Sequence, residues 1–314
     1  MGHIPGSGND KPDNMKRSLI FLFVLPLALL LVSCEKEVKF DLGSSAEKVV
    51  IEGTIETDLP PYVFLSKSIG FFSKIDLNTL SNAYLHDAKI TVSDGTQSFV
   101  LREYQVINAG ISFYFYSVDS ADLAALAFRG TIGKTYSLKV EYGGKVYEST
   151  TVIPQPKALD SLWAKPPPPE EMPKDHPNSM LLFARYTDPD TLGNRVRYFT
   201  KRNEGRFLPP YYSVNDDAII NGSRIDIQLN AGFDRMDTID QQTLGYFYKG
   251  DTVIVKWSAI DKGVFDFWRT LEFSYGATGN PFASPVEITS NISGGALGVW
   301  AGYGNTFDTL VIPQ

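Results

Sequence analysis

Residues 136–150 contain the clearest β-hairpin signal of this 314-residue chain. Apolar and polar side chains alternate along 136–142, and the alternation resumes along 145–150 after Gly143-Gly144. Two-residue hairpin turns require positive φ angles, which glycine adopts without a steric cost. The pattern therefore predicts two antiparallel strands joined by a tight turn, and it favours a β-rich fold around them.

The rest of the first half of the chain shows similar short segments. Asp94-Gly95 is a second turn dipeptide between two alternating runs. Further strands are expected at 48–55, 88–93, 98–104 and 111–116, with a short helix at 121–127. About seven strands in about 105 residues favour a sandwich of immunoglobulin or transthyretin type. Pro154 and Pro156 end the segment, so we predict an N-terminal β-sandwich over residues 47–156.

Residues 157–314 are predicted to form a larger C-terminal β domain. Its expected strands are 161–164, 180–186, 195–201, 223–229, 252–258, 286–289 and 309–312. A proline-dense segment at 166–177 cannot enter the centre of a sheet. We interpret it as a surface loop, and the alternative is that it links the two domains. The expected fold class is therefore mostly all-β, with two antiparallel β domains.

One helix is expected within the C-terminal domain. Asp261 is suited to cap its N-terminus, and Gly276 is placed to end it. The apolar side chains that share one face of this helix are Val264, Trp268, Leu271 and Tyr275. We interpret this aromatic stripe as a surface that packs against a sheet, and not as a cofactor site.

The N-terminus carries the pattern of an export signal. Lys16 and Arg17 precede an apolar run at 19–32, which is shorter than the roughly 20 residues that span a bilayer. The run ends at Cys34, the only cysteine of the chain. This arrangement resembles the bacterial lipobox, whose cysteine receives acyl chains such as palmitate. The resemblance implies that residues 1–33 are removed and that Cys34 is the lipid attachment site.

The residues around the predicted cleavage site suggest how the protein is displayed. Residues 1–14 precede a second methionine and look like a tag or a misplaced start site. Residues 34–46 are mostly polar and are expected to form a tether behind the anchor. Glu35 and Glu37 resemble the surface-export signal of Bacteroidota lipoproteins. The expected location is therefore the outer membrane, lipid-anchored and facing the cell surface.

Composition and motifs exclude several classes of function. The formal net charge is -7, whereas a nucleic-acid-binding protein needs a basic face. One cysteine and three histidines leave little material for disulfides or for a metal centre. HExxH, GxSxG, P-loop and CxxC motifs are all missing from the sequence. We therefore expect no enzyme activity, no catalytic residues, no cofactor and no metal.

Residues 188–194, with the sequence DPDTLGN, have some features of a calcium-binding loop. They supply several oxygen ligands and a glycine. The loop lacks the closing bidentate glutamate of a complete calcium site. A solvated turn between strands is the simpler interpretation, and calcium near Asp188 stays open.

The segment 207–212, with the sequence FLPPYY, is the candidate for ligand or partner binding. Two prolines stiffen it, and its aromatic residues Phe207, Tyr211 and Tyr212 lie outside any strand pattern. Rigid aromatic side chains suit sugar stacking or a protein interface. A loop that folds onto the β core is the more ordinary alternative.

Six sites share the form Asp-Ser/Thr-apolar, which resembles the general O-glycosylation motif of exported Bacteroidota proteins. The candidate acceptors are Ser120, Ser161, Thr191, Thr238, Thr252 and Thr309. Asp-Ser and Asp-Thr also begin strands after turns. Both interpretations can hold together because a strand entry is exposed.

Several motifs together carry a family resemblance. They include NPFASPV at 280–286, a glycine-rich segment at 290–303, VIEG at 50–53, NAYLHDAKITV at 82–92 and GDTV at 250–253. Their order and spacing resemble a Bacteroidota outer-membrane lipoprotein family defined by domain of unknown function 4249. One departure is Trp300, where phenylalanine is expected. The resemblance implies no catalytic residue, and members are often encoded beside a TonB-dependent receptor.

The expected function is a binding or accessory module of a TonB-dependent transporter or another outer-membrane protein. The alternatives are a structural or assembly subunit of an envelope complex and, as a third choice, a glycan-acting enzyme. A cleft lined by aromatic residues favours ligand capture, and a flat apolar patch favours the structural role. A pocket with convergent carboxylates favours the enzyme.

The anchor can be tested with Cys34→Ala. This variant should leave the membrane fraction or keep its leader, because the acyl chains are the expected membrane attachment. Membrane fractionation and intact mass of the protein from its native host measure both effects. Normal size together with normal membrane retention would contradict the assignment.

Overall fold

The computed structural model describes Gly2 and residues 47–69, 81–108, 110–235, 237–238, 240–277 and 286–314. The chain divides into two compact units, Met1–Ser45 and Ala46–Gln314. Cys34 and the predicted leader and tether fall almost entirely outside the described residues. Within the part of the chain that is described, no helix is long and apolar enough to cross a membrane.

The second unit is mostly β, as expected. Its largest sheet has eight strands in the order β12-β11-β15-β16-β1-β2-β6-β5. These strands are β12 (Val214–Asp216), β11 (Arg195–Arg202), β15 (Thr252–Ala259), β16 (Leu297–Val311), β1 (Val49–Glu56), β2 (Tyr62–Lys67), β6 (Ile111–Ser117) and β5 (Arg102–Asn108). We call it the long sheet.

Two smaller sheets and two helices complete the described elements. The first small sheet has the order β4-β3-β7-β8, and the second joins β13, β10 and β14, with β9 also paired to β10. The strands of the first are β4 (Ser98–Val100), β3 (Lys89–Ser93), β7 (Thr135–Tyr142) and β8 (Lys145–Val152). Those of the second are β13 (Arg224–Leu229), β10 (Ser179–Thr187), β14 (Phe247–Tyr248) and β9 (Ser161–Lys165). The helices are α3 (Leu123–Ala127) and α4 (Lys262–Ala277).

Strand β16 holds the long sheet together. Its first half pairs in parallel with β1, from Leu297 to Tyr303. Its second half pairs in antiparallel fashion with β15, from Gly304 to Val311. A strand of the predicted C-terminal domain therefore completes a sheet that begins in the predicted N-terminal one. The boundary expected at residue 156 stays a prediction.

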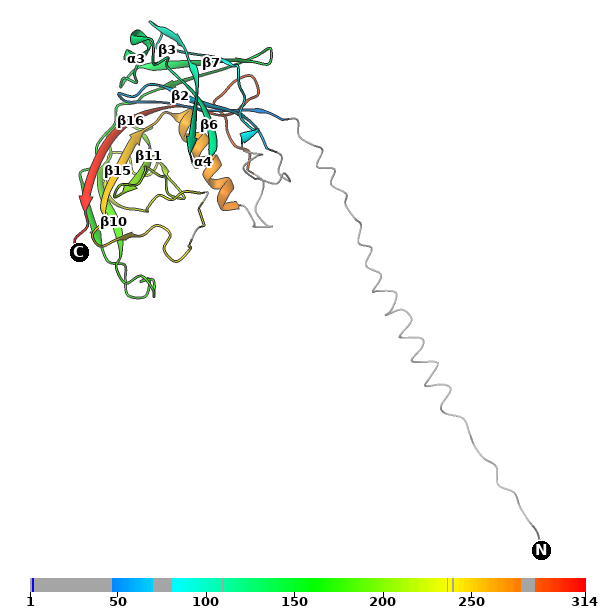
Figure 1. The fold of residues 1–314 in the computed structure, drawn as a ribbon. Helices are drawn as coiled ribbons and strands as arrows, with labels where there is room; N and C mark the ends of the chain where they lie inside the picture. The colour runs from blue at the N-terminus through cyan, green and yellow to red at the C-terminus, as the bar shows by residue number, and fades with distance from the viewer. Residues whose placement is uncertain are drawn as a thin grey trace. The chain divides into compact units, whose positions relative to one another are not determined.

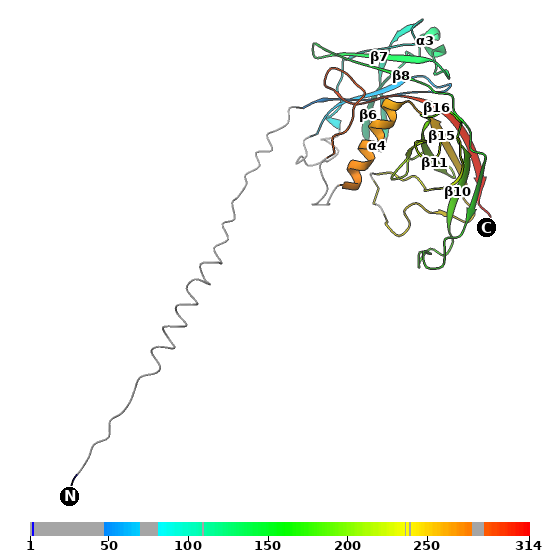
Figure 2. The same cartoon turned by 180° about the vertical axis from the view of Figure 1, so that it is seen from behind.

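The long sheet buries one face against the two small sheets. Ile51 and Ile55 of β1 and Trp300 of β16 lie in a core shared with β3, β7 and β8. Farther along the same sheet, Val255 and Trp257 of β15 share a second core with β10 and β13. In Figures 1 and 2, β3 and β7 lie on one side of the β1–β16 pair and α4 lies on the other. The opposite face of the sheet is thus left for α4.

Both predicted hairpins are present. Tyr142 pairs with Lys145 across Gly143-Gly144, whose φ angles are 58° and 73°. Ser93 pairs with Ser98 around the turn that contains Gly95, with φ 85°. These are the left-handed values that the turn dipeptides were expected to provide.

Three details of the strand predictions were wrong. The expected strand at 98–104 is two strands in different sheets, because the chain crosses between sheets at Leu101, which is buried in the core. Residues 286–290 form no strand; Thr289 N–H instead donates to Oγ1 of Thr270 on α4. The final strand is much longer than 309–312, since it begins at Leu297.

The proline-dense segment 166–177 connects neighbouring strands. It follows β9 and precedes β10, and these strands pair directly, with Lys165 opposite Leu181. Within the sheet, β10 lies between β9 and β13. The segment therefore joins two strands of one sheet, which agrees with the interpretation as a surface loop.

The parallel contact between β1 and β16 can be tested with Gly298→Ala. Gly298 has φ +120°, and an added Cβ would lie 1.9 Å from the carbonyl oxygen of Ile51. The variant should lose far more stability than the roughly 1–2 kcal/mol that a left-handed backbone alone costs another residue. Gly295→Ala is a matched control, because Gly295 has φ +82° and nothing within 4 Å of an added Cβ. Chemical denaturation measures both, and equal losses would contradict the close approach.

Candidate functional site

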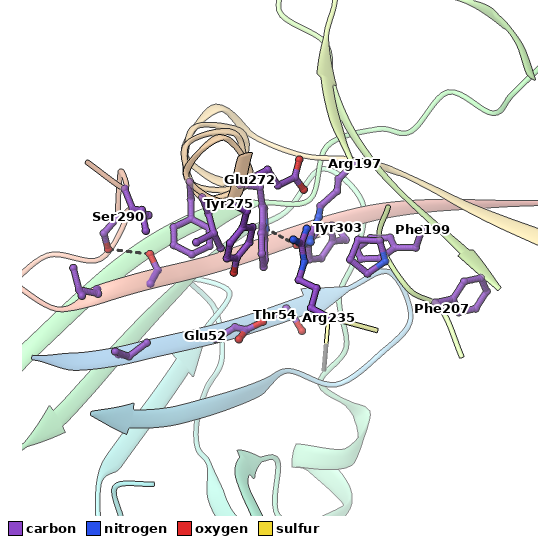
Figure 3. Close-up of a pocket in the computed structure, with 18 of the residues that line it drawn as sticks. Glu52, Thr54, Arg197, Phe199, Phe207, Arg235, Glu272, Tyr275, Ser290 and Tyr303 are labelled. Atoms are coloured by element: carbon purple, nitrogen blue, oxygen red, sulfur yellow. Dashed lines mark hydrogen bonds between the residues drawn. The ribbon is translucent and has the colours of Figure 1, made fainter. Parts of the chain in front are cut away.

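A cavity of about 730 Å³ lies between the free face of the long sheet and α4. Strand β1 provides much of its floor, because alternate side chains of a strand point to the same face. Val50, Glu52, Thr54 and Glu56 line the cavity, whereas Ile51 on the same strand is fully buried in the core. Figure 3 shows Glu52 and Thr54 extending from β1 toward the side chains of α4.

Helix α4 forms the opposite wall and is fixed at its N-terminus. Asp261 caps it, as expected, since its Oδ1 accepts a hydrogen bond of 2.9 Å from Val264 N–H. Its Oδ2 accepts hydrogen bonds from the Thr151 hydroxyl and the Val152 N–H of β8. The cap therefore ties the helix to the first small sheet. Trp268, Leu271 and Tyr275 line the cavity, although we expected the aromatic stripe to be core.

The most enclosed cation of the cavity is Arg197 of β11, which is 5% exposed. Its Nε donates to Ser213 Oγ at 3.0 Å, and its Nη1 donates to the Tyr303 hydroxyl at 2.9 Å. The guanidinium carbon lies 3.4 Å from the ring centroid of Trp268 and 4.7 Å from that of Phe199. Two aromatic faces and two neutral acceptors thus hold this charge in place.

A buried ion pair lies beside Arg197. Lys256 Nζ of β15 is 3.1 Å from both carboxylate oxygens of Glu56 on β1, across the intervening strand β16. Asn305 of β16 also donates to Glu56, at 2.8 Å. Burial lowers the pKa of Lys256, and the adjacent Glu56 carboxylate opposes that shift. The three strands are therefore joined by charge as well as by backbone hydrogen bonds.

Glu272 of α4 is a second carboxylate of the cavity that is already hydrogen-bonded within the protein. Ser213 donates both its backbone N–H, at 2.8 Å, and its hydroxyl to the two oxygens of Glu272. Ser213 in turn accepts a hydrogen bond from Arg197. This chain of contacts connects the helix to β11, and Glu272 is only 2% exposed, so a ligand has little access to it.

Glu52 is different because its carboxylate is accessible from the cavity. It makes no hydrogen bond or close ion pair with the described residues. Glu52 is exposed to the open space of the cavity, but the surrounding walls desolvate it and raise its pKa, while the charge of Arg197 lowers it. Arg235 also lines the cavity, 4.3 Å from the ring centroid of Tyr275, and it forms no ion pair with a described carboxylate.

The rest of the wall is rich in aromatic rings. They come from several elements of the chain: Tyr62, Phe199, Phe207, Phe267, Trp268, Tyr275 and Tyr303. Burial raises the pKa of Tyr62 to about 12, so its hydroxyl stays neutral at physiological pH. The cavity thus combines apolar walls with a few fixed polar groups, which is typical of a small-molecule site.

The structure divides the candidate loop between the cavity and the surface. Phe207 lines the cavity and packs against Phe307, with ring centroids 5.8 Å apart. Tyr211 and Tyr212 meet edge to face at 5.0 Å, and Tyr212 is 58% exposed. Arg235 donates to the Tyr211 carbonyl, which places the loop beside a cavity-lining residue. The binding role of the three aromatic residues stays a prediction.

Most candidate glycosylation sites are accessible. Ser120, Ser161, Thr191, Thr238 and Thr309 are exposed, and Thr252 is half-buried. Ser161 and Thr252 begin β9 and β15, whereas Thr309 lies inside β16. Two of the six motifs, those of Ser161 and Thr252, therefore lie at the beginning of a strand. Modification stays a prediction at all six.

The region proposed for calcium is organised by backbone amides. Asp217 accepts hydrogen bonds from the N–H groups of Gly193 and Asn194, and Asp188 accepts one from Gly222. In the described part of the chain, no group of three or more His, Cys, Asp or Glu side chains is arranged to hold a metal ion. Asp188 and Asp217 are both buried, so their carboxylates are satisfied by backbone amides and are not solvated as the simpler interpretation of 188–194 expected.

Sequence reasoning missed the charged residues of the cavity. A signal was present, since Glu52 and Glu56 interrupt the apolar strand VVIEGTIE at positions that share one face. A charged side chain in a buried strand needs a partner or a purpose. Finding Arg197 and Lys256 beside them requires the order of the strands, which one sequence does not provide.

Comparison with known proteins places the chain in a family. The family model described as Domain of unknown function (DUF4249) matches residues 35–307, which is most of the chain. No curated protein matches it.

The buried pair of Lys256 and Glu56 can be tested by a double-mutant cycle. Lys256→Met should lower the free energy of unfolding by about 3–5 kcal/mol, because it leaves a buried carboxylate without its cation. The double variant Glu56→Leu with Lys256→Met should lose much less than the sum of the two single changes. Urea unfolding measures each value. A double loss equal to that sum would show that the two groups are not coupled.

Proposed function

Since the chain belongs to the family described as Domain of unknown function (DUF4249), we propose that it is a lipid-anchored binding module of the outer membrane. In this proposal the cavity captures a ligand and a TonB-dependent transporter receives it. Cys34 carries the anchor, and residues 34–46 hold the folded unit away from the lipid surface. The transporter partnership comes from the family resemblance of the sequence.

The observation that carries the ligand-capture role is the composition of the cavity. A wall of aromatic rings surrounds Glu52 and Arg235, which form no ion pair with a described residue, whereas Lys256, Glu56 and Glu272 already have partners. Its volume of about 730 Å³ is within the range of about 300–1,000 Å³ that is common for small-molecule sites. An aromatic cleft was the feature expected to favour ligand capture over the other roles.

An enzyme has less support than a binding module. A glycosidase needs two carboxyl groups facing a sugar across a cleft. Of the three carboxylates that line the cavity, Glu56 is bound to Lys256 and Asn305, and Glu272 is bound to Ser213. Only Glu52 among the described carboxylates of this cavity keeps its oxygens free for a substrate.

One observation favours the structural role as a second candidate. Strand β5 is the end of the long sheet, so one of its edges has no partner among the strands that the structure describes. Val106 and Ile107 of β5 are 49% and 68% exposed, and Phe113 on β6 is 38% exposed. An unpaired edge with apolar side chains can accept a strand from another protein.

The partnership can be tested with Tyr211→Ala combined with Tyr212→Ala. If the loop contacts a membrane-protein partner, the double variant should co-purify less of it, because aromatic anchors commonly contribute about 2 kcal/mol or more each. Thermal stability should change little, since Tyr212 is largely exposed. Affinity purification from outer membranes with mass spectrometry measures the partner.

Phe273→Ala is the matched control for this experiment. Phe273 is an aromatic residue of α4 that is 60% exposed and does not line the cavity. Its loss should leave co-purification unchanged. If no outer-membrane transporter is recovered with the unaltered protein, the proposed function is wrong. If the tyrosine variant recovers as much partner as the control, the loop is not the contact.

A further inference from the structure

We propose that the cavity binds a zwitterionic ligand with an apolar body, namely a short peptide with free termini. Arg197 and Arg235 would receive its carboxylate, and Glu52 would receive its ammonium group. This inference rests on the proposed function, because it names the ligand class of the same cavity. It follows from a comparison of the cavity charges that already have partners within the protein with those that do not.

Arg197 is the positively charged part of the proposed binding site. Its Nε and Nη1 donate to neutral oxygens, and no described carboxylate lies within ion-pair distance of it. Its Nη2 has no hydrogen-bond acceptor among the described residues. A guanidinium that is 5% exposed and has no anion is costly to keep. A ligand carboxylate supplies the missing charge and accepts the free N–H groups.

Glu52 is the negatively charged part of the proposed binding site. It lines the same cavity as Arg197, is accessible from it, and forms no close ion pair with it. Desolvation by the cavity walls disfavours its ionised form, although the side chain is exposed to the open space, so a cationic partner inside the cavity would stabilise the carboxylate. The fold therefore holds a free anion and an under-satisfied cation apart on one surface. A ligand with one charge of each sign is the simplest complement.

The other charges of the cavity do not compete for this ligand. Lys256 is neutralised by Glu56, and Glu272 accepts two hydrogen bonds from Ser213. Arg235 remains available as a second guanidinium, stacked near Tyr275. A neutral sugar would stack on the aromatic wall but would leave Arg197 and Glu52 without counter-charges, so the charges favour a peptide.

The size and walls of the cavity define the body of the ligand. A volume of about 730 Å³ exceeds the needs of a single amino acid and suits a drug-sized molecule. Phe199, Phe207 and Phe267 provide apolar faces, and Tyr62 and Tyr275 add hydroxyl groups. A peptide of a few residues with aliphatic or aromatic side chains fits this combination.

The probe for the test is the tripeptide Leu-Phe-Leu, in four forms measured by calorimetry. These are the peptide with free termini, the N-acetylated form, the C-amidated form and the form with both ends blocked. We expect the free peptide to bind and each single block to weaken binding by tenfold or more. Maltotriose is the comparison ligand for the sugar alternative and should not bind.

Glu52→Gln makes the test specific to the proposed contact. The side chain has no hydrogen bond to lose, so the variant should fold normally. It should bind the free and N-acetylated peptides equally, while the penalty for C-amidation remains. Arg197→Lys should instead reduce the penalty for C-amidation, with circular dichroism as the check on its folding. The control Glu204→Gln changes an exposed carboxylate that does not line the cavity and should behave as the unaltered protein.

The outcomes separate this inference from the proposed function. Equal binding of all four peptide forms, binding of maltotriose alone, or no binding of any probe would overturn the zwitterion assignment. In each case, recovery of a transporter with the protein would leave the proposed function intact. Conversely, the expected peptide pattern without any transporter partner would support the ligand class and reject the partnership.

Discussion

The exchange of partners along β16 is the constraint on which the other features of the fold depend. Its first seven residues pair in parallel with β1, and its remaining residues pair in antiparallel fashion with β15. One continuous strand thereby places the two packed cores on the same side of a single sheet. Helix α4 packs on part of the opposite side, against Val299, Ala301 and Tyr303 of β16, and the rest of that side becomes the floor of the cavity. Gly298 permits the parallel approach, because a side chain there would collide with the backbone of Ile51.

The cavity surface concentrates charge that most sheets would exclude. Strands β1, β15 and β11 of the long sheet place Glu56, Lys256 and Arg197 on the same face, within reach of α4 and its Trp268. Mutual pairing satisfies Glu56 and Lys256, whereas aromatic rings and neutral hydroxyls hold Arg197. Cation–π contacts stabilise a guanidinium without neutralising it, so its field still reaches the open space. The charge on this surface is therefore arranged in advance of any ligand.

The sequence was a good guide to local structure and a poor guide to the site. Glycine pairs at tight turns and the Asp261 cap act over a few residues, so both were correctly predicted. Leu101 shows the first limit, since nothing local indicates that the chain changes sheets there. Arg197 and Glu52 show the second, because their proximity depends on a strand order set by pairings between distant segments. Phe207 was identified from its stiff aromatic loop, yet its position on the cavity wall comes from packing against Phe307.

The parallel pairing of the first and last strands also has a consequence for the time course of folding. The amide of Asn305 and the carboxylate of Glu56 that it binds are separated by 249 positions in the sequence. Contacts over such a separation carry a large loop-closure cost and form slowly. In a chain that is made N-terminus first, the edge of β1 stays exposed until β16 has also emerged. During that interval the apolar edge is open to the wrong strand of another chain. The time between the appearance of β1 and that of β16 is therefore the stage at which this architecture depends most on protection by other proteins.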